Sequence, residues 1–318
     1  MSSDSSAAWK ARHRRWLHFV VANIHAVESG KAIPLGPTIP ALKAAEGSAA
    51  RGARLKVIVC SPHPDDEALI GALPLRLQQE CGSRVTNVAI TLGSALDQRA
   101  RRRRELKASC AVLGFNLVVA NAPHGFDDIV LETRTKRPKE WAKKVRALSL
   151  ILEHVNPDVV FAPHVEDVNV THVATHHLVV DATADFLKRT QRGPLAFIET
   201  EFWHEHSCPN LMVGISPADE AILLMAAAEH GVEVRRNPYH LRHPARMIDN
   251  VRRGAEIVLE AGGPAPDVPL AEIYRLVFVS GQGMMAPRPG GRLIRPEDRI
   301  EWKSLVEHFR PVKPQAQR

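Results

Sequence analysis

Aromatic residues and paired cysteines are scarce in this chain of 318 residues. Phe, Trp and Tyr together make up 5% of it, and no two of its four cysteines form a Cys-x-x-Cys pair (Cys60, Cys81, Cys110, Cys208). The low aromatic content and the lack of a recognition motif argue against nucleic-acid binding. Unpaired cysteines in apolar surroundings predict reduced, buried thiols of a cytoplasmic protein.

Long apolar runs are also missing. No run approaches the roughly 20 residues that a membrane span requires, and the nearest, residues 16–27, is interrupted by His18, Asn23 and His25. The same stretch lacks the long apolar centre and cleavage site of a secretory signal. It therefore predicts an amphipathic helix within an N-terminal extension, residues 1–50. Residues 51–318 are expected to form one domain, with residues 235–318 as an annex to it.

Predicted strands and helices alternate along this domain. Strands are expected at 55–60, 85–91, 116–120, 158–162, 195–202 and 274–280, and helices near 66–80, 97–113, 138–154, 171–190 and 217–230. Alternation of this kind predicts an α/β fold: a Rossmann-like, mostly parallel sheet with helices on both faces. The chain has no Gly-x-Gly-x-x-Gly, which argues against dinucleotide binding.

The most informative segment follows the first predicted strand. Residues 57–67 read Val-Ile-Val-Cys-Ser-Pro-His-Pro-Asp-Asp-Glu. A buried strand followed by polar residues is typical of the carboxyl ends of a parallel sheet, where ligands bind. His63 and Asp66 are close enough in sequence to share a divalent metal. Asp65 lies between them and is free to act as a base, although an Asp pair alone would more often cap a helix.

A second, histidine-rich segment lies about a hundred residues downstream. Residues 157–164 end in Pro-His, and Thr171 is a plausible N-cap for a helix that carries His172 and His176 on one face. His164 and His172 both lie near the exit of a predicted strand. One His-Asp pair and one such histidine make three protein ligands with a position left open, the arrangement of a catalytic zinc site.

The segment 61–67 resembles the A/S-x-H-P-D-D-E signature of the PIG-L/LmbE-like family of metal-dependent N-deacetylases. By position, the resemblance implies that His63, Asp66 and His172 bind zinc or another divalent metal and that Asp65 is the general base. It covers about residues 55–280 and implies a deacetylase domain at residues 51–318. A segment like residues 237–253 occurs in a longer subgroup of these proteins, and its polar residues fit a pocket wall or a structural loop equally well.

Between these motifs the resemblance is partial. Arg102 and Glu105 match the family's Arg-x-x-Glu, whereas residues 91–94, Thr-Leu-Gly-Ser, lack the Glu of the family loop T-x-G-E. Asn169 replaces a family His that acts on the oxyanion or the leaving amine, and His124 replaces the Asp of a Pro-Asp-Gly loop. Arg102, His124 and Asn169 are the predicted substrate-binding residues.

The chemistry explains why these residue types are needed. Zinc lowers the pKa of its bound water toward about 7 and polarises an amide carbonyl, while Asp65 can move the proton from that water to the departing amine. The oxyanion would be held by the metal and by His164, His176 or the amide of Asn169. The resulting prediction is removal of an acetyl or other acyl group from an N-acetylglucosamine-type sugar conjugate.

Net charge is +7, and much of it lies in Arg99 and residues 101–104. A solvated helix face is the default interpretation, but consecutive arginines cannot all face one way, so Arg102 can point into the site. The excess charge favours an anionic or sugar-phosphate substrate. Gly/Pro-rich loops at 262–269 and 284–296 are candidate lids or homo-oligomer contacts.

Two other classes remain open from the residues alone. A metal-binding protein of the same fold without turnover would explain Asn169 and the missing loop Glu. A two-His-one-carboxylate set also serves non-haem iron oxygenases, although the alternating pattern argues against their usual β-sandwich fold.

Overall fold

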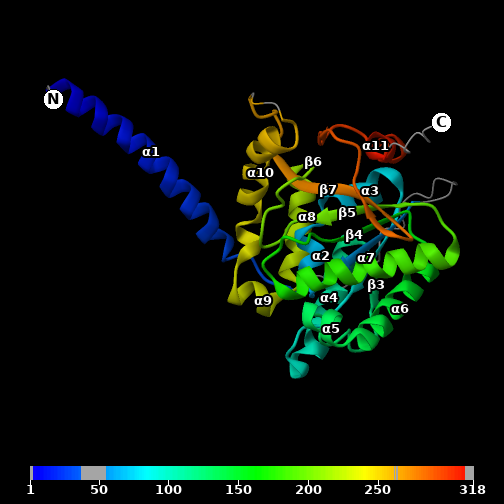
Figure 1. Cartoon of the computed structure of the whole chain (residues 1–318). Helices are drawn as coiled ribbons and strands as arrows, with labels where there is room; N and C mark the ends of the chain where they lie inside the picture. Colours follow the sequence, from blue (N-terminus) through cyan, green and yellow to red (C-terminus); the bar gives the residue numbers. More distant parts are fainter. Residues whose placement is uncertain (1–2, 37–54, 261, 263, 312–318) are drawn as a thin grey trace, which may run out of the picture.

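In the computed structural model, which describes residues 3–36, 55–260, 262 and 264–311, the strands form one mixed sheet (Figure 1). Their order is β3-β2-β1-β4-β5-β7-β6-β9, and β8 pairs with β7. Their bounds are β1 Lys56–Ser61, β2 Arg84–Ala89, β3 Asn116–Val119, β4 Val159–Pro163, β5 Leu195–Thr200, β6 Leu211–Ile215, β7 Leu270–Ser280, β8 Gly283–Met285 and β9 Arg292–Ile294.

The five strands from β3 to β5 are parallel. Val57 of β1 lies opposite Val85 of β2 on one side and Val159 of β4 on the other. Such strands are buried on both faces and therefore read as continuous apolar runs. β1 fits this rule, since residues 57–60 are at most 2% exposed. Because β1 lies inside the parallel sheet, its carboxyl end adjoins the ends of β2 and β4.

Helices cover both faces of the sheet, as predicted. Successive side chains of β1 alternate between two apolar clusters: Val57 and Val59 pack with one, Ile58 and Cys60 with the other. The first cluster includes residues of α3 (Ala72–Cys81), α4 (Arg99–Leu113), α8 (Pro217–Ala228) and α11 (Trp302–Phe309). The second includes residues of α6 (Pro138–Val155) and α7 (Val170–Thr190).

The helix expected at 66–80 is divided. α2 (Asp66–Leu69) stops short of α3, which begins at Ala72. Pro74 lies in the first turn of α3, where its missing N–H costs nothing, whereas a continuous helix would place its ring against the carbonyl of Ile70. The break leaves α2 as a short turn directly behind Asp66.

The last predicted strand does not run parallel to the others. β7 is antiparallel to both β5 and β6 and extends over residues 270–280 rather than 274–280. Alternation in sequence specifies no strand direction, which depends on where α10 (His243–Ile257) returns the chain. The sequence also missed β6, β8, β9, α5 (Leu131–Lys136), α9 (Gly231–Arg236), α10 and α11, with the 3₁₀ turns η1 (Leu96–Gln98) and η2 (Tyr239–Leu241).

A buried arginine ties the C-terminal part to this sheet. Arg76 of α3 is 2% exposed, and its guanidinium donates to the carbonyls of Gly214, Arg295 and Asp298 at 2.7, 2.9 and 2.5 Å. Its Nε donates to Glu80 at 2.6 Å. Each of the three guanidinium nitrogens thus has a hydrogen-bond partner, so the segment after β9 is held against the core.

The N-terminal helix α1 (Ser3–Gly30) extends away from the rest of the protein (Figure 1). The domain boundary expected near residue 50 lies outside the described residues. None of the described helices is long and apolar enough to cross a membrane.

All four cysteines are free, as predicted, but their burial differs. Cys60 and Cys110 are buried, Cys81 is partly buried and Cys208 is exposed. Burial raises the pKa of the Cys60 thiol. The prediction that Cys208 is buried was wrong, because it lies in the loop between β5 and β6 rather than in a strand or helix.

Candidate metal centre

The loop after β1 carries two of the predicted ligands to the carboxyl edge of the sheet. β1 ends at Ser61, and α2 begins at Asp66. Within this loop the backbone N–H of His63 donates to Asp66 Oδ2 at 2.8 Å. The same carboxylate oxygen lies 3.5 Å from His63 Nδ1. The short loop therefore brings the imidazole and the carboxylate together through a local contact.

The third predicted ligand comes from α7. His172 lies in the first turn of that helix and is 0% exposed. Asn169, not Thr171 as predicted, is the N-cap: its side-chain oxygen accepts from the N–H of Thr171 at 2.9 Å and of His172 at 3.4 Å. Asn is among the strongest N-capping residues, and this cap orients the turn that carries His172.

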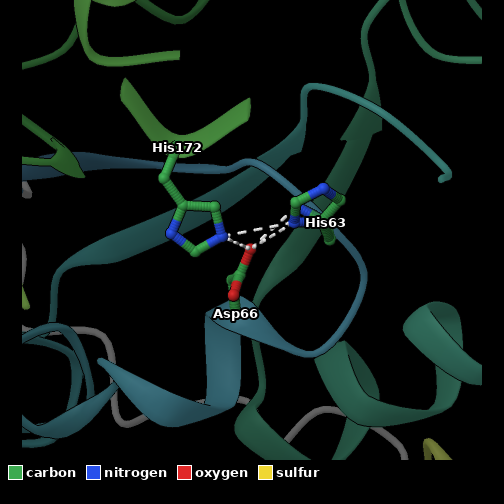
Figure 2. A group of neighbouring side chains, drawn as sticks. All are labelled: His63, Asp66 and His172. Carbon is green, nitrogen blue, oxygen red and sulfur yellow. Dashed lines mark hydrogen bonds and ion pairs between the residues drawn. The ribbon is translucent and has the colours of Figure 1, made fainter. Parts of the chain in front are cut away.

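The structure brings His63, Asp66 and His172 together, with His63 and His172 both turned toward Asp66 (Figure 2). His172 Nε2 lies 3.4 Å from Asp66 Oδ2 and 3.2 Å from His63 Nδ1. Tetrahedral zinc with bonds of about 2.0–2.1 Å has ligand atoms about 3.3–3.4 Å apart. The three donor atoms thus already have the mutual spacing of one face of such a site, and their chemistry suits zinc.

Neighbouring groups hold these donors in place. Asp167 Oδ2 lies 3.4 Å from His172 Nδ1, on the side of the ring away from Asp66. A carboxylate beside the second ring nitrogen favours the tautomer that leaves Nε2 as the donor to a metal. The ring of Phe202 packs edge-on against His172, with centroids 4.7 Å apart. His172 is therefore held from two sides.

The electrostatics of the cluster favour a cation. Burial alone would raise the pKa of Asp66, but His172 and His63 outweigh it and hold the pKa of that carboxyl below its usual range. Burial opposes charge on His172 as well, yet Asp66 and Asp167 raise its pKa to about 9. The Asp66 carboxylate is therefore held in its ionised form, which is the form that binds a divalent ion.

Asp65 has an unusual backbone conformation beside this cluster. Its φ is +112°, which non-glycine residues rarely adopt. Its backbone N–H donates to Glu67 Oε2 at 3.0 Å, and its side-chain Oδ2 accepts from the Tyr239 hydroxyl at 2.6 Å. Burial and the adjacent Asp66 raise the pKa of Asp65 to about 6, although His230, Tyr239 and Arg102 act in the opposite direction. Strain of this kind is often found at functional sites.

A buried network supports the Asp65 backbone from below. Glu67 Oε1 accepts from the Ser109 hydroxyl at 2.5 Å and lies 2.8 Å from His230 Nε2, and Glu67 and His230 are both 0% exposed. Burial would lower the pKa of His230, but the Glu67 carboxylate outweighs it and raises that pKa. α2, α4 and the start of α9 are thereby joined beneath the site.

A cavity of about 580 Å³ opens onto the centre. His63, Asp65 and Asp66 line it together with Arg102, Asn169 and Trp203. The Arg102 guanidinium donates to the Pro64 carbonyl at 3.1 Å and makes no ion pair with the described carboxylates. It also lies over Gly93, where a side chain would collide with Arg102 Nη1. Gly93 has a φ of +87°, so glycine suits this position on both counts.

The arginines of this run face different directions. Arg102 faces the cavity, Arg101 pairs with Glu105 at 2.5 Å, and Arg103 and Arg104 are exposed. Arg99 also lines the cavity, where Asp127 pairs with it.

His124 is not brought to the cavity. It is exposed in the loop after β3, and its N–H donates to the Asn121 carbonyl at 3.2 Å within a turn. Phe126, two residues on, lines the cavity in its place. The turn between Asn121 and Gly125 directs the histidine to solvent, so the substrate contact expected from it has no support in the geometry.

Two other predicted histidines are engaged elsewhere. His176 Nδ1 lies 2.9 Å from the Pro163 carbonyl. His164 Nε2 lies 2.9 Å from the His204 carbonyl, and its Nδ1 accepts from the N–H of Glu166 at 3.2 Å. Neither histidine is among the residues that line the cavity. Of the three oxyanion donors predicted from the sequence, only Asn169 therefore lies on the cavity wall.

His164, Glu166 and His206 form a second group of close metal-type donors. Their atoms are already used: His206 Nδ1 accepts from the N–H of Cys208 at 3.0 Å, and Glu166 accepts from the backbone and hydroxyl of Ser207. With the lone pairs of both histidines occupied by backbone donors, this group is a hydrogen-bonded loop anchor.

Sequence reasoning missed Tyr239 and Glu67 as partners of Asp65, and His230 as a partner of Glu67. The polar segment around Tyr239 fits a pocket wall or a structural loop on sequence grounds, and the contact of its hydroxyl with Asp65 favours the pocket wall. Tyr239 is one of only two tyrosines in the chain, and its place in a polar segment was the available signal.

The fold and this centre define an α/β protein with a His-Asp-His cluster at the carboxyl ends of parallel strands. Residues 58–183 match the sequence model of the family described as PIG-L, GlcNAc-PI de-N-acetylase. This segment, which holds all three cluster residues, therefore belongs to the PIG-L/LmbE-like family, and the resemblance seen in the sequence is confirmed. No curated protein matches the chain.

Solved structures share the fold at low sequence identity. The conserved protein TT1542 from Thermus thermophilus has a TM-score of 0.52 and 22% identity, over 77% of this chain and 100% of that one. GalB, the 4-carboxy-2-hydroxymuconate hydratase from Pseudomonas putida, has a TM-score of 0.53 and 16% identity, over 76% of this chain and 100% of that one. A zinc-inhibited form of teicoplanin deacetylase Orf2 has a TM-score of 0.51 and 15% identity, over 70% of this chain and 97% of that one. A hydratase and a deacetylase thus share one scaffold, so the site must decide the reaction.

Proposed function

We propose that this protein is a metal-dependent amide hydrolase that removes an acetyl or other acyl group from the nitrogen of an amino-sugar conjugate. The observation that carries the proposal is the spacing of the His63, Asp66 and His172 donor atoms, 3.2 to 3.5 Å apart, with Asp65 beside them. Membership of a family described as de-N-acetylases supports the reaction type.

His63, Asp66 and His172 would hold the metal. Zinc, the ion that suits two imidazoles and a carboxylate, lowers the pKa of water and polarises a carbonyl when it is bound. Asp66 Oδ2 is central among the donors, since it lies within 3.5 Å of both imidazole nitrogens. Asp167 would keep His172 in the tautomer that presents Nε2.

Asp65 would move the proton. As water adds to the amide carbon, the Asp65 carboxylate accepts a proton from it, and the carbonyl oxygen takes up negative charge. The C–N bond then breaks, and the amine leaves with the proton that Asp65 returns, which gives a free amine and a carboxylate. The Tyr239 hydroxyl would orient Asp65, and the side chain of Asn169, on the cavity wall, would face the oxyanion.

Arg102 is the proposed contact to the substrate's oxygens. Its guanidinium lies at the cavity and makes no ion pair with any carboxylate of the part of the chain that the structure describes, whereas Arg99 and Arg236 of the same wall pair with Asp127 and Glu233. A planar guanidinium offers paired donors that suit hydroxyl or phosphate oxygens. These features support an anionic or sugar-phosphate conjugate as the substrate class.

Release of free amine from a panel of N-acetylated sugars tests the proposal. We expect amine and acetate in equal amounts from phosphorylated or larger N-acetylglucosamine conjugates, with low activity toward free N-acetylglucosamine. A metal-loaded protein that releases no amine from any member of the panel would instead be a binding protein. Oxygen consumption would indicate the iron oxygenase alternative, against which the mostly parallel sheet already argues.

Replacing Arg102 by Lys should raise KM more than it lowers kcat. Lys keeps the charge but loses the paired donors, so it weakens binding in the ground state and the transition state alike. Steady-state kinetics on the best substrate of the panel measure the split. Arg103→Lys is the control, because Arg103 is exposed on the same helix. An unchanged KM in Arg102→Lys would show that Arg102 does not bind the substrate, and its only role would then be the contact with the Pro64 carbonyl.

Replacing Tyr239 by Phe should lower kcat by about 10- to 100-fold, the value of a hydrogen bond to a charged group. KM and metal content should hold, because the ring stays and no ligand is removed. The chain's other tyrosine supplies the control. Tyr274 is buried in the sheet and accepts from the N–H of Leu73 at 2.9 Å, so Tyr274→Phe should lower the unfolding midpoint with little effect on kcat. Equal kcat in Tyr239→Phe and the unchanged chain would exclude the positioning role.

A further inference from the structure

Helix α1 has no part in the site and carries large apolar side chains in water. It projects from the rest of the protein (Figure 1), and every side chain from Trp9 to Ala26 is exposed. The exposed apolar residues include two tryptophans that are 59% and 60% exposed. The larger ones are Trp9, Trp16, Leu17, Phe19, Val20 and Ile24. An exposed apolar concentration of this kind marks an interaction surface.

Most of these side chains share one face of the helix. At about 100° per residue, Trp9, Trp16, Leu17, Val20 and Ile24 fall within an arc of roughly 100°. The opposite face carries Arg14, Arg15, His18 and His25. The helix is therefore amphipathic, with an apolar stripe along its exposed length.

Every charged side chain of α1 between residues 5 and 27 is basic. Lys10, Arg12, Arg14 and Arg15 lie among the apolar residues, and the sequence has no Asp or Glu from residue 5 to residue 27. Glu28, at the end of the helix, is already paired with Lys31 at 2.6 Å. A second copy of α1 packed on the stripe would add four more positive charges with few negative partners, which disfavours self-association.

We propose that α1 lies on the surface of an anionic lipid bilayer, with its apolar stripe in the interface. Such a surface supplies both an apolar layer for the stripe and negative headgroups for the four basic residues. Trp9 and Trp16 suit this depth, because tryptophan prefers the membrane–water interface. The helix binds in the plane of the membrane and does not cross it, since it is not apolar enough to span.

The base of α1 lies against the part of the chain that supports the site. A side chain at Gly30 would meet Leu241 at 2.7 Å, and the N–H of Gly36 donates to the Ala228 carbonyl at 3.1 Å. His230 and Tyr239, which contact Glu67 and Asp65, lie in this same stretch. The helix would thus hold the catalytic domain beside the bilayer.

Flotation of the full chain with vesicles tests the proposal. We expect the protein to float with phosphatidylcholine vesicles that contain about 30% phosphatidylserine, and to float at least about fivefold less with phosphatidylcholine alone. Raising the salt from about 0.1 M to about 1 M should reduce binding, because screening weakens the contact of the basic residues with the headgroups. Tryptophan fluorescence should shift to the blue on addition of the anionic vesicles.

Two double variants separate the contributions. Trp9→Ser with Trp16→Ser removes the apolar anchors, and Arg14→Glu with Arg15→Glu reverses the charge; each should lower the bound fraction at least about fivefold. Lys139→Glu with Lys143→Glu changes the charge equally at exposed positions of α6 and should bind as the unchanged chain does. Absence of vesicle binding, or binding that both α1 variants retain, would overturn the proposal. The proposal would also be overturned if the unchanged chain formed a dimer and did not bind vesicles, and if the tryptophan variant were monomeric. If a variant fails to fold, the tryptophan fluorescence of the unchanged chain tests the proposal instead: a blue shift with anionic vesicles supports it, and no shift contradicts it.

Discussion

Asp65→Asn is expected to keep its metal and lose activity by about 10²- to 10⁴-fold. The substitution removes the proton acceptor but no ligand, since His63, Asp66 and His172 form the cluster. Asn also tolerates the left-handed backbone region of this position better than most residues do, and its side-chain oxygen can still accept from Tyr239. Amine release and metal content, measured on the same preparation, test both parts of this expectation.

A matched control for this variant is Asp97→Asn. Asp97 is an exposed carboxylate in η1, so its loss changes the net charge equally without touching the cluster. Its activity should remain within about twofold of the unchanged chain. If the activity of Asp65→Asn falls only in step with its metal content, Asp65 is a ligand or a scaffold residue and the proposed mechanism is wrong.

Asp66→Ala should reduce the bound metal from about one ion per chain to less than about a tenth of that. Asp66 Oδ2 contacts both imidazoles, and its loss leaves two nitrogen donors with no charge to offset the ion. His172→Ala should behave in the same way. Elemental analysis after dialysis gives the metal content, and far-UV circular dichroism checks that the fold persists, as expected for ligands on loops and a helix end.

His124→Ala is the control for metal content, because this histidine is exposed and does not line the cavity. Its variant should hold a full complement of metal. Treatment of the unchanged chain with a chelator should abolish amine release, and added zinc should restore it. Full metal content in both Asp66→Ala and His172→Ala would refute the assignment of the cluster.

Most of the parallel sheet and the motif after its first strand could be predicted from the sequence, because they depend on residues that are close together in the chain. The apolar run before His63 and the two prolines around it predicted a strand that ends in a polar loop, and the structure has that strand at Lys56–Ser61. The alternation of elements predicted a mostly parallel sheet covered on both faces. These features depend on neighbours in sequence, which act within a few residues of one another.

Contacts between segments that are far apart in the chain could not be predicted from the sequence. The direction of β7 depends on how α10 returns the chain. The segment of α10 was predicted only as a polar cluster, because most of the residues that this helix buries are polar or small rather than large and apolar. The hydroxyl of Tyr239 reaches Asp65 across 174 positions of sequence, and His230 reaches Glu67 across 163. No local pattern marks such contacts.

The sequence by itself therefore predicted the candidate ligands His63, Asp66 and His172, the strand that leads to the first two of them and the amphipathic character of the N-terminal helix. Only the tertiary structure showed that His164 is hydrogen-bonded elsewhere, that His124 turns to solvent and that Tyr239 contacts Asp65. The physical reason is that hydrogen bonding to the backbone, which local sequence does not reveal, had already engaged His164. A side chain is available for chemistry only when the packed chain leaves its polar atoms unpaired and aimed at the site.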